Sequence, residues 1–312
     1  MDLKRGVFFT DTLVEGDPKI NVIKTITQGI KKHGACVEFE KYNKDTIDKY
    51  DFSILPGFFV SHKIENTSRR NKIRKKIYDY FCQNDKQIII PDTSVFNAYD
   101  SKYKIIHSLN TFDVSKYHNL SYDKFDFSRW ELIRKKMGIS IKNWNIENKS
   151  DIVICCQRMR GWRANGLNTY EWIVDIVKDC KLQYPDKNIL IRFHPGDSGR
   201  TTGIISQVMK KYNFEKNNIK ISNKNSLLDD LKNAFLIFNH NSSVSFTSSV
   251  QGIPAVLSDI NGSFAKKISF ETIKTFKDSD RYPNIENEIK KISALHWTQE
   301  EIENGMFWDS LL

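Results

Sequence analysis

Short apolar runs alternate with stretches of helical periodicity along this chain, and the alternation limits the possible folds more than any other feature. Between the apolar runs lie segments such as Ile20–His33, Arg69–Cys82 and Asn168–Gln183, whose apolar residues recur with helical spacing. Strands and helices that take turns in this way build βαβ units around a parallel sheet, so the sequence predicts an α/β protein. The strand-like runs are Gly6–Phe9, Cys36–Phe39, Phe52–Leu55, Gln87–Pro91, Asp151–Cys155, Asn188–Arg192, Ile219–Ser222, Ala234–Phe238 and Pro254–Leu257.

The alternation occurs as two series, which predicts two domains. The chain has 312 residues, enough for two domains of about 150 residues each. Between the two series lies the polar, aperiodic segment Lys142–Ser150. We therefore expect a Rossmann-like domain over 1–147 and a second Rossmann-like domain over 148–295, facing each other across a cleft.

The last segment, 296–312, carries a helix signal of its own. Thr298 suits an N-cap, and Glu301, three residues later, completes a capping box. The segment holds too many apolar side chains to remain in water, so we expect it to pack back on the N-terminal domain. These side chains are Trp297, Ile302, Met306, Phe307 and Trp308.

The chain is strongly basic, with a formal net charge of +10. An excess of this size favours a polyanionic partner such as DNA, RNA or an anionic membrane surface. Basic residues are densest over Lys63–Lys76, where Glu65 is the one acidic residue among them. The same segment is also compatible with an ordinary solvated helix face, and both interpretations stay open at this point.

Membrane and disulfide signals are weak. No apolar run approaches the roughly 18 residues that a membrane helix needs, and Met1–Arg5 is not followed by the apolar core of a signal peptide. The five cysteines are odd in number and show no CxxC spacing, so we expect reduced and mostly buried thiols. These features predict a cytoplasmic protein without a membrane partner.

Two strand ends in the second half carry polar side chains suited to a phosphate group. The run from Asn188 ends at Arg192 and His194, and the run Ala234–Phe238 ends at Asn241–Ser243, before an expected helix. Ligands of open α/β sheets bind at the carboxyl ends of the strands, and helix N-termini attract anions. We therefore expect a nucleotide diphosphate site. The alternatives are a structural pair at Arg192 and His194 and an ordinary N-cap at Asn241–Ser243.

Transfer of a group from a nucleotide diphosphate donor to a hydroxyl requires a base that accepts the proton, and three carboxylates are candidates. Asp92 follows the run ending at Pro91 and is the preferred base, although an aspartate there could also cap the next helix. Asp11 and Glu15 lie on the loop after the first strand and are the alternatives. A carboxylate on the face opposite the leaving diphosphate favours an inverting mechanism.

We expect no metal to be required at the donor site. Asp278 and Asp280 have the spacing of a metal motif, but they lie in a polar segment and not after a strand, which indicates surface residues. Arg158, Arg192 and the Asn241–Ser243 segment would neutralise the leaving group instead. A divalent ion could still assist.

Taken together, these motifs resemble phage-encoded GT-B glycosyltransferases, above all those that modify 5-hydroxymethylcytosine in phage DNA, including the arabinosyl-transferring members. The His-Pro and Asn-Ser-Ser elements are more distantly similar to capsule polysaccharide transferases of the Kdo type. The resemblance covers nearly the whole C-terminal half, with two elements of the first half. The motifs are Cys156-Gln157-Arg158, Gly161-Trp162, Ile191–Asp197, Ser226-Leu227-Leu228, Asn241-Ser242-Ser243, Gly252-Ile253-Pro254, His296–Ile302, Pro91–Phe96 and Arg129-Trp130.

The resemblance implies a GT-B fold and transfer of a sugar, arabinose or glucose, from a UDP-sugar to the hydroxyl of 5-hydroxymethylcytosine. The partners would be double-stranded DNA and the nucleotide sugar, and the enzyme would be a monomer in the cytoplasm of the host cell. The predicted donor-binding residues are Gln157, Arg158, Arg192, His194, Ser226, Leu227, Asn241, Ser242, Ser243 and Asp259.

Two other functions remain open from the sequence. A transferase with the same donor site could act on a bacterial surface or capsule glycan. A non-catalytic DNA-binding protein could also retain the fold, although no helix-turn-helix, zinc finger or aromatic RNA motif is visible.

Overall fold

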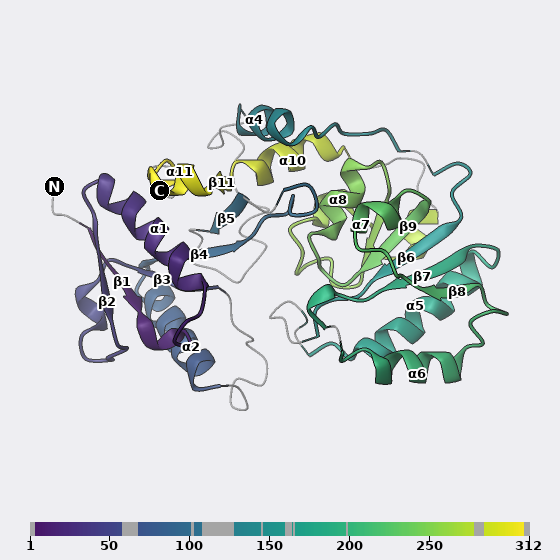
Figure 1. Ribbon diagram of the computed structural model, residues 1–312, viewed down its shortest axis with the longest axis horizontal. Coiled ribbons are helices and arrows are strands. Elements are labelled where there is room, and N and C mark those ends of the chain that lie inside the picture. The colour runs from purple at the N-terminus through teal and green to yellow at the C-terminus, as the bar shows by residue number, and fades with distance from the viewer. Residues whose placement is uncertain are drawn as a thin grey trace. The chain divides into compact units, whose positions relative to one another are not determined.

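The computed structural model describes residues 4–57, 68–100, 103–107, 128–144, 146–159, 164, 166–197, 199–277 and 284–308. The chain forms two compact units (Figure 1). Unit 1 comprises Met1–Leu120 with Ala294–Leu312, and unit 2 comprises Ser121–Ser293. Each unit has its own sheet and its own hydrophobic core.

Unit 1 is built on a six-stranded sheet with the order β11-β5-β4-β3-β1-β2. The strands β1 to β4 are parallel, whereas β5 and β11 are antiparallel additions at one edge. These two strands were not predicted from the sequence. The bounds are β1 Arg5–Phe9, β2 Cys36–Glu40, β3 Phe52–Ile54, β4 Gln87–Thr93, β5 Tyr103–His107 and β11 His296–Thr298.

Helices cover both faces of the first sheet because its strands bury alternate residues on opposite sides. Phe8 packs with the apolar side of α1 (Lys19–Lys32), whereas Val7 and Phe9 pack with α2 (Arg69–Gln83). The alternation along β1 therefore builds a doubly wound unit, as predicted. The described residues of unit 1 also form the helical segments η1 Thr10–Thr12, η2 Ile47–Lys49 and α11 Gln299–Glu303.

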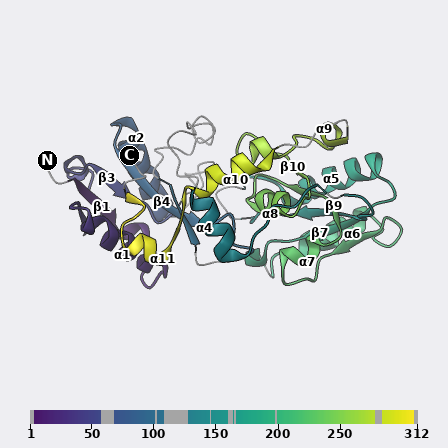
Figure 2. The same cartoon turned by 90° about the horizontal axis from the view of Figure 1, so that it is seen from above.

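The C-terminal segment packs in unit 1, as predicted. Thr298 and Glu301 form the expected capping box at the start of α11. The rings of Trp308 and Phe52 lie with their centroids 5.3 Å apart. Both views show α11 beside α1 (Figures 1 and 2).

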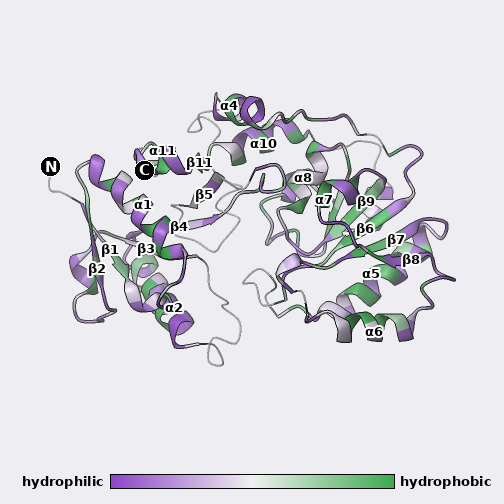
Figure 3. Ribbon diagram, viewed as in Figure 1, coloured by the Kyte–Doolittle hydropathy of each residue, from purple (hydrophilic) through white to green (hydrophobic). Residues whose placement is uncertain are grey.

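Unit 2 contains a five-stranded, wholly parallel sheet with the order β10-β9-β6-β7-β8. Hydrophobic residues concentrate on its central strands (Figure 3). The strands are β6 Asp151–Cys155, β7 Asn188–Arg192, β8 Ile219–Ile221, β9 Ala234–Asn239 and β10 Ala255–Leu257. The helical segments are α4 Ser128–Met137, α5 Thr169–Gln183, η6 Pro195–Asp197, α6 Thr202–Lys211, α7 Leu227–Leu231, α8 Val244–Val250, η7 Lys266–Ile268, α9 Ile273–Lys277 and α10 Ile285–Ser293.

The unit boundary differs from the one expected. Residues 121–147, assigned to the first domain, group with unit 2, because α4 packs against α10. That packing links segments about 150 residues apart in the chain, and no local sequence pattern indicates it.

All five cysteines are free, and three of them are buried. Among the described residues, no helix is both long and apolar enough to cross a bilayer.

Candidate functional site

The strand order of unit 2 locates a ligand site. From β6 the chain adds β7 and β8 on one side and β9 and β10 on the other, so the topology reverses between β6 and β9. Ligands of such sheets bind outside the carboxyl ends of the strands at this reversal. The polar segments that were predicted to bind the donor follow β6, β7, β9 and β10, and therefore lie at one edge of the sheet.

Arg158 and His194 lie close together at this edge. A Cβ built on Gly196 would be 3.1 Å from Nδ1 of His194 and 3.3 Å from Nε of Arg158, so both side chains lie beside Gly196. Arg158 is exposed to solvent. The structure thus brings together two of the side chains that were expected to contact a diphosphate.

His194 is held as a neutral hydrogen-bond donor. Its Nδ1 accepts a 3.0 Å hydrogen bond from the Gly196 amide, which leaves the hydrogen of the neutral ring on Nε2. Burial lowers the pKa of His194, and although Asp197 opposes this effect, the charges of Arg158 and Arg192 add to it. Near neutral pH this imidazole can therefore donate one hydrogen bond to an anionic ligand.

Asp197 joins the loops that follow β6 and β7, a role that was not predicted from the sequence. Its side chain is 1% exposed, and Oδ2 accepts a 2.9 Å hydrogen bond from the Met159 amide. Gln157, two residues before Met159, was predicted to bind the donor. Its side chain is 8% exposed, and its Oε1 has no hydrogen-bond partner in the described part of the chain. The position of Asp197 directly after Pro195-Gly196 at a strand end was the available signal.

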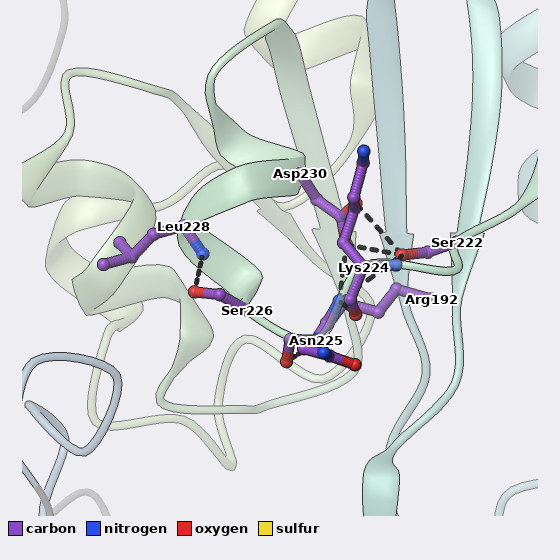
Figure 4. Close-up of polar contacts among 7 residues, drawn as sticks. All are labelled: Arg192, Ser222, Lys224, Asn225, Ser226, Leu228 and Asp230. Carbon is purple, nitrogen blue, oxygen red and sulfur yellow. Dashed lines mark hydrogen bonds and ion pairs between the residues drawn. The ribbon is translucent and has the colours of Figure 1, made fainter.

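Arg192, which was predicted to bind the donor, makes several contacts within the protein. Its guanidinium lies 2.6 Å from Oδ2 of Asp230 and also donates to the main-chain oxygens of Lys224 and Asn225, at 2.9 and 3.2 Å (Figure 4). The side chain is 13% exposed. Arg192 therefore binds the loop after β8, and the alternative of a structural strand-end residue describes its contacts.

Ser226 ends the same loop and Leu227 is the first residue of α7, and both were predicted to bind the donor. Ser226 caps α7, because its Oγ accepts a 3.2 Å hydrogen bond from the Leu228 amide. Leu227 is half-buried and packs against the cluster that contains Val153. Both residues lie where they can line the edge of the sheet, but the contacts that they make within the protein are structural.

A second polar cluster follows β9 and β10. Trp172 Nε1, which can only donate, gives a 2.8 Å hydrogen bond to Oγ of Ser258, and this hydroxyl lies 2.9 Å from Nδ1 of His240. This hydroxyl therefore links Trp172 of α5 to the His240 ring. Burial lowers the pKa of His240, and Asp259 opposes this effect.

Asp259 and Asn241, both predicted donor contacts, belong to this cluster. Nδ2 of Asn241 donates to Oδ2 of Asp259 at 2.8 Å, and the Gly262 amide donates to Oδ1 at 3.0 Å. A Cβ on Gly262 would come within 2.1 Å of the same carboxylate, so the turn closes tightly around it. The Asp259 side chain remains 35% exposed, which leaves it accessible to a ligand.

The predicted phosphate-binding turn at Asn241–Ser243 is partly occupied by the protein itself. The Ser242 amide donates to Oδ1 of Asn239 at 2.7 Å, and the Val244 amide donates to Oγ of Ser242 at 3.4 Å. These two amides would have to exchange partners to bind a phosphate. Ser243 is exposed at the start of α8 and makes no side-chain cap.

In unit 1 the sheet reverses between β1 and β3, and Asp11 follows β1 at this point. Its Oδ1 accepts a 3.1 Å hydrogen bond from the Tyr42 amide. Asp92 lies within β4 and not beyond its end, in register with Ile105 of the antiparallel β5, and its Oδ1 accepts from the Thr93 amide at 2.8 Å. Asp92 is therefore a residue of the paired strand β4 and does not cap a helix, which was the alternative considered for it. Glu15 is exposed on the loop after η1.

The predicted basic segment divides into two faces where it is described. Residues 58–67 lie outside the described part of the chain, and so do Asp278 and Asp280. On α2, Arg70 donates to the Leu13 oxygen at 3.0 Å, and Arg74 donates twice to the Thr12 oxygen, at 2.7 and 3.1 Å. These two arginines hold the loop after β1. Arg69, Lys72 and Lys76 are exposed.

No group of three or more His, Cys, Asp or Glu side chains in the described ranges is arranged to hold a metal ion.

No protein-family model and no curated protein matches the chain. Its structure is similar to two solved Thermosulfurimonas dismutans KpsC structures. The beta Kdo 2,7 transferase has a TM-score of 0.50 at 10% identity, covering 98% of each chain. The beta Kdo 2,4 transferase has a TM-score of 0.54 at 11% identity, covering 95% of this chain and 90% of that chain.

A third structure, Anabaena Alr3699/HepE in complex with UDP-glucose, has a TM-score of 0.41 at 10% identity over 98% of each chain. The KpsC likeness confirms the predicted α/β fold with two parallel-sheet Rossmann-like domains, as found in GT-B glycosyltransferases. At these identities the likeness establishes the fold alone.

Proposed function

We propose that this protein is a glycosyltransferase that uses a nucleotide diphosphate sugar, such as a UDP-sugar carrying arabinose or glucose. The donor binds at the carboxyl edge of the unit 2 sheet. The observation that carries the proposal is the pairing of an exposed arginine, Arg158, with the neutral donor His194 at the point where the strand order reverses. A positive charge and a directed N–H group are what a leaving diphosphate requires.

In the proposed reaction the acceptor oxygen bonds to the anomeric carbon while the bond from that carbon to the diphosphate oxygen breaks. Arg158 and His194 stabilise the charge that develops on the diphosphate. The acceptor proton passes to a carboxylate of unit 1, with Asp92 as the first candidate, Asp11 as the second and Glu15 as the third. Attack from the face opposite the leaving group inverts the anomeric centre.

The acceptor that we propose is the hydroxyl of 5-hydroxymethylcytosine in double-stranded DNA. Two features support it: the resemblance of its motifs to those of phage transferases and the net charge of +10. The exposed Arg69, Lys72 and Lys76 on α2 are suited to phosphate contacts, since their spacing places them on one side of the helix.

A glycan acceptor is the second candidate, and the fold likeness to the two Kdo transferases favours it. The internal bonds of Arg70 and Arg74 also reduce the number of basic side chains available for DNA. The donor site would be the same in both cases. The two candidates therefore differ in the acceptor alone.

The deciding experiment incubates the protein with a panel of nucleotide sugars and duplex DNA containing 5-hydroxymethylcytosine, followed by mass spectrometry of the nucleosides. A sugar adduct on the modified base, absent from matched cytosine DNA, is the expected result. A parallel reaction with capsule-type oligosaccharides tests the second candidate. Transfer to the oligosaccharide without transfer to DNA would replace the first acceptor by the second, and transfer to neither would contradict both.

A further inference from the structure

The segment 222–226, between β8 and α7, is held in place by one side chain from the neighbouring strand β7. Nη1 of Arg192 donates to the Lys224 oxygen, and Nη2 donates to the Asn225 oxygen. Nη1 also lies 3.4 Å from Oγ of Ser222 (Figure 4). Arg192 therefore contacts the beginning and the middle of a segment that lies about 30 residues further along the chain.

Asp230 completes this arrangement from the other end of α7. Its side chain is 1% exposed and receives hydrogen bonds from Arg192 at 2.6 Å and from Ser222 at 2.7 and 3.0 Å. A buried carboxylate that loses its cationic partner is strongly destabilised. Arg192 consequently cannot turn toward a ligand without leaving Asp230 buried and unpaired.

The held segment belongs to the same edge of the sheet as the proposed donor site. It follows the carboxyl end of β8, and β8 is the neighbour of β7, whose own end leads through Phe193 to His194. The segment ends at Ser226, which caps α7. A shift of this segment would therefore move the start of α7 and the rim of the edge where the donor binds.

We propose that Arg192 is a positioning residue: its ion pair with Asp230 fixes the 222–226 segment and the first turn of α7 as one wall of the donor site, and Arg192 itself does not touch the donor. The part that concerns the donor rests on the proposed function. The structural part, that the pair orders the segment, stands independently of it. Asp230 becomes a positioning residue as well, although its burial keeps it away from any ligand.

The two possible roles of Arg192 predict different behaviour in Asp230→Asn. If Arg192 contacted the diphosphate directly, Asp230→Asn would release the guanidinium and leave donor binding equal or tighter. If the pair acts by positioning, Asp230→Asn weakens donor binding as Arg192→Ala does. The double variant, Arg192→Ala with Asp230→Asn, then binds the donor little more weakly than either single variant. The effects of two substitutions in one hydrogen-bond network are not additive, and the departure from additivity reaches roughly 100-fold in an equilibrium constant.

The test measures hydrogen exchange of the 222–231 amides and the donor KM and kcat in Arg192→Ala, Arg192→Lys and Asp230→Asn. Asp229→Asn is the matched control, since Asp229 is the adjacent aspartate, lies at the surface and pairs with Lys232. We expect faster exchange and a donor KM raised about tenfold in the pair variants, within the range for coupled residues, with kcat changed much less. Arg192→Lys retains one contact with Asp230 and is expected to be intermediate.

Each outcome decides the proposal. Unchanged exchange in Arg192→Lys and Asp230→Asn overturns it, and so does a raised KM in Arg192→Ala with a normal KM in Asp230→Asn. Arg192→Lys and Asp230→Asn keep the test valid if Arg192→Ala does not fold. If the wild type uses no nucleotide sugar, the proposed function fails and the exchange data alone decide whether the pair orders the segment.

Discussion

Gly29 of α1 and Ile302 of α11 approach so closely that no side chain fits between them. A Cβ on Gly29 would lie 2.0 Å from the main-chain oxygen of Ile302. Gly305, at φ +77°, takes part in the same contact, since its Cβ would lie 2.5 Å from the Gly29 oxygen. These two glycines therefore allow the C-terminal segment to pack on α1.

Gly29→Ala is expected to destabilise unit 1 by about 1–3 kcal/mol, the usual cost of overpacking. The reason is that α11 must move away from α1 to make room for the methyl group. Urea unfolding measures the change. Gly203→Ala in α6 is the control, because nothing lies within 4 Å of its added Cβ, and this variant should be neutral or slightly more stable. Equal stability of both variants would contradict the close contact.

Arg158→Ala is expected to lower transfer about 100-fold, the usual effect of removing one group that stabilises a developing negative charge. Steady-state kinetics with the identified donor measures it. Arg134→Ala removes an exposed arginine that pairs with Glu131 on α4, and it serves as the control. If both variants keep wild-type turnover while folded, Arg158 is not part of the donor site.

Asp92→Asn and Asp11→Asn separate the two main candidates for the base. The amide keeps the shape of the side chain but cannot accept a proton, so the true base variant should retain donor binding and lose transfer. We expect this loss in Asp92→Asn. A dead Asp11→Asn or Glu15→Gln beside an active Asp92→Asn would move the base to the loop after β1.

The depressed pKa values of His194 and His240 predict how stability depends on pH. In the unfolded chain both groups bind protons as the pH falls through 6.5, but in the folded protein burial delays protonation to lower pH. The unfolded state then holds more protons, so stability is lost as the pH falls below 6.5. The measurement is the decrease in melting temperature between pH 8 and pH 5. We expect a smaller decrease in the double variant His194→Gln/His240→Gln than in the wild type. An equal decrease in the two proteins would show that these histidines do not cause the loss of stability at low pH.

The exposed face of α2 gives a test of DNA binding. If Arg69, Lys72 and Lys76 bind phosphates, replacing all three by Gln should reduce the slope of log affinity against log salt by about 0.9 for each phosphate that is no longer bound. Lys178, Lys210 and Lys211 are exposed in unit 2, and their triple Gln variant is the charge-matched control. An equal slope in both variants removes α2 from the interface. Arg70 and Arg74 are left intact because they hold the loop after β1.

The fold was largely predictable because buried parallel strands have short apolar runs as their sequence pattern, such as Asn188–Arg192 and Ala234–Phe238. The capping box at Thr298 was also predictable, since its pattern lies within four residues. The strand Tyr103–His107 could not be predicted in this way. It pairs with β4 and with β11, which lies nearly 200 residues further along the chain, and such pairing leaves no local pattern in the sequence.

The direction of single side chains was the least predictable part of the site. The sequence placed Arg192 and His194 correctly at a strand end, but it could not show that a carboxylate at Asp230, 38 residues later, would bind the guanidinium. The same holds for Ser242 and Val244, whose amides are already bonded to side chains of the turn. Interactions of this kind depend on how loops meet across the sheet, and strand and helix periodicity does not encode them.

The central claim is a nucleotide-sugar site at the carboxyl edge of the unit 2 sheet, and direct binding tests it without knowledge of the acceptor. Calorimetric titration of a nucleotide-sugar panel into the wild type and into Arg158→Ala is the measurement. The predicted result is saturable binding of one nucleotide class by the wild type, weakened by about tenfold or more in Arg158→Ala, as expected when one charged hydrogen bond is removed. No binding of any nucleotide sugar, or equal binding by both proteins, would contradict the claim.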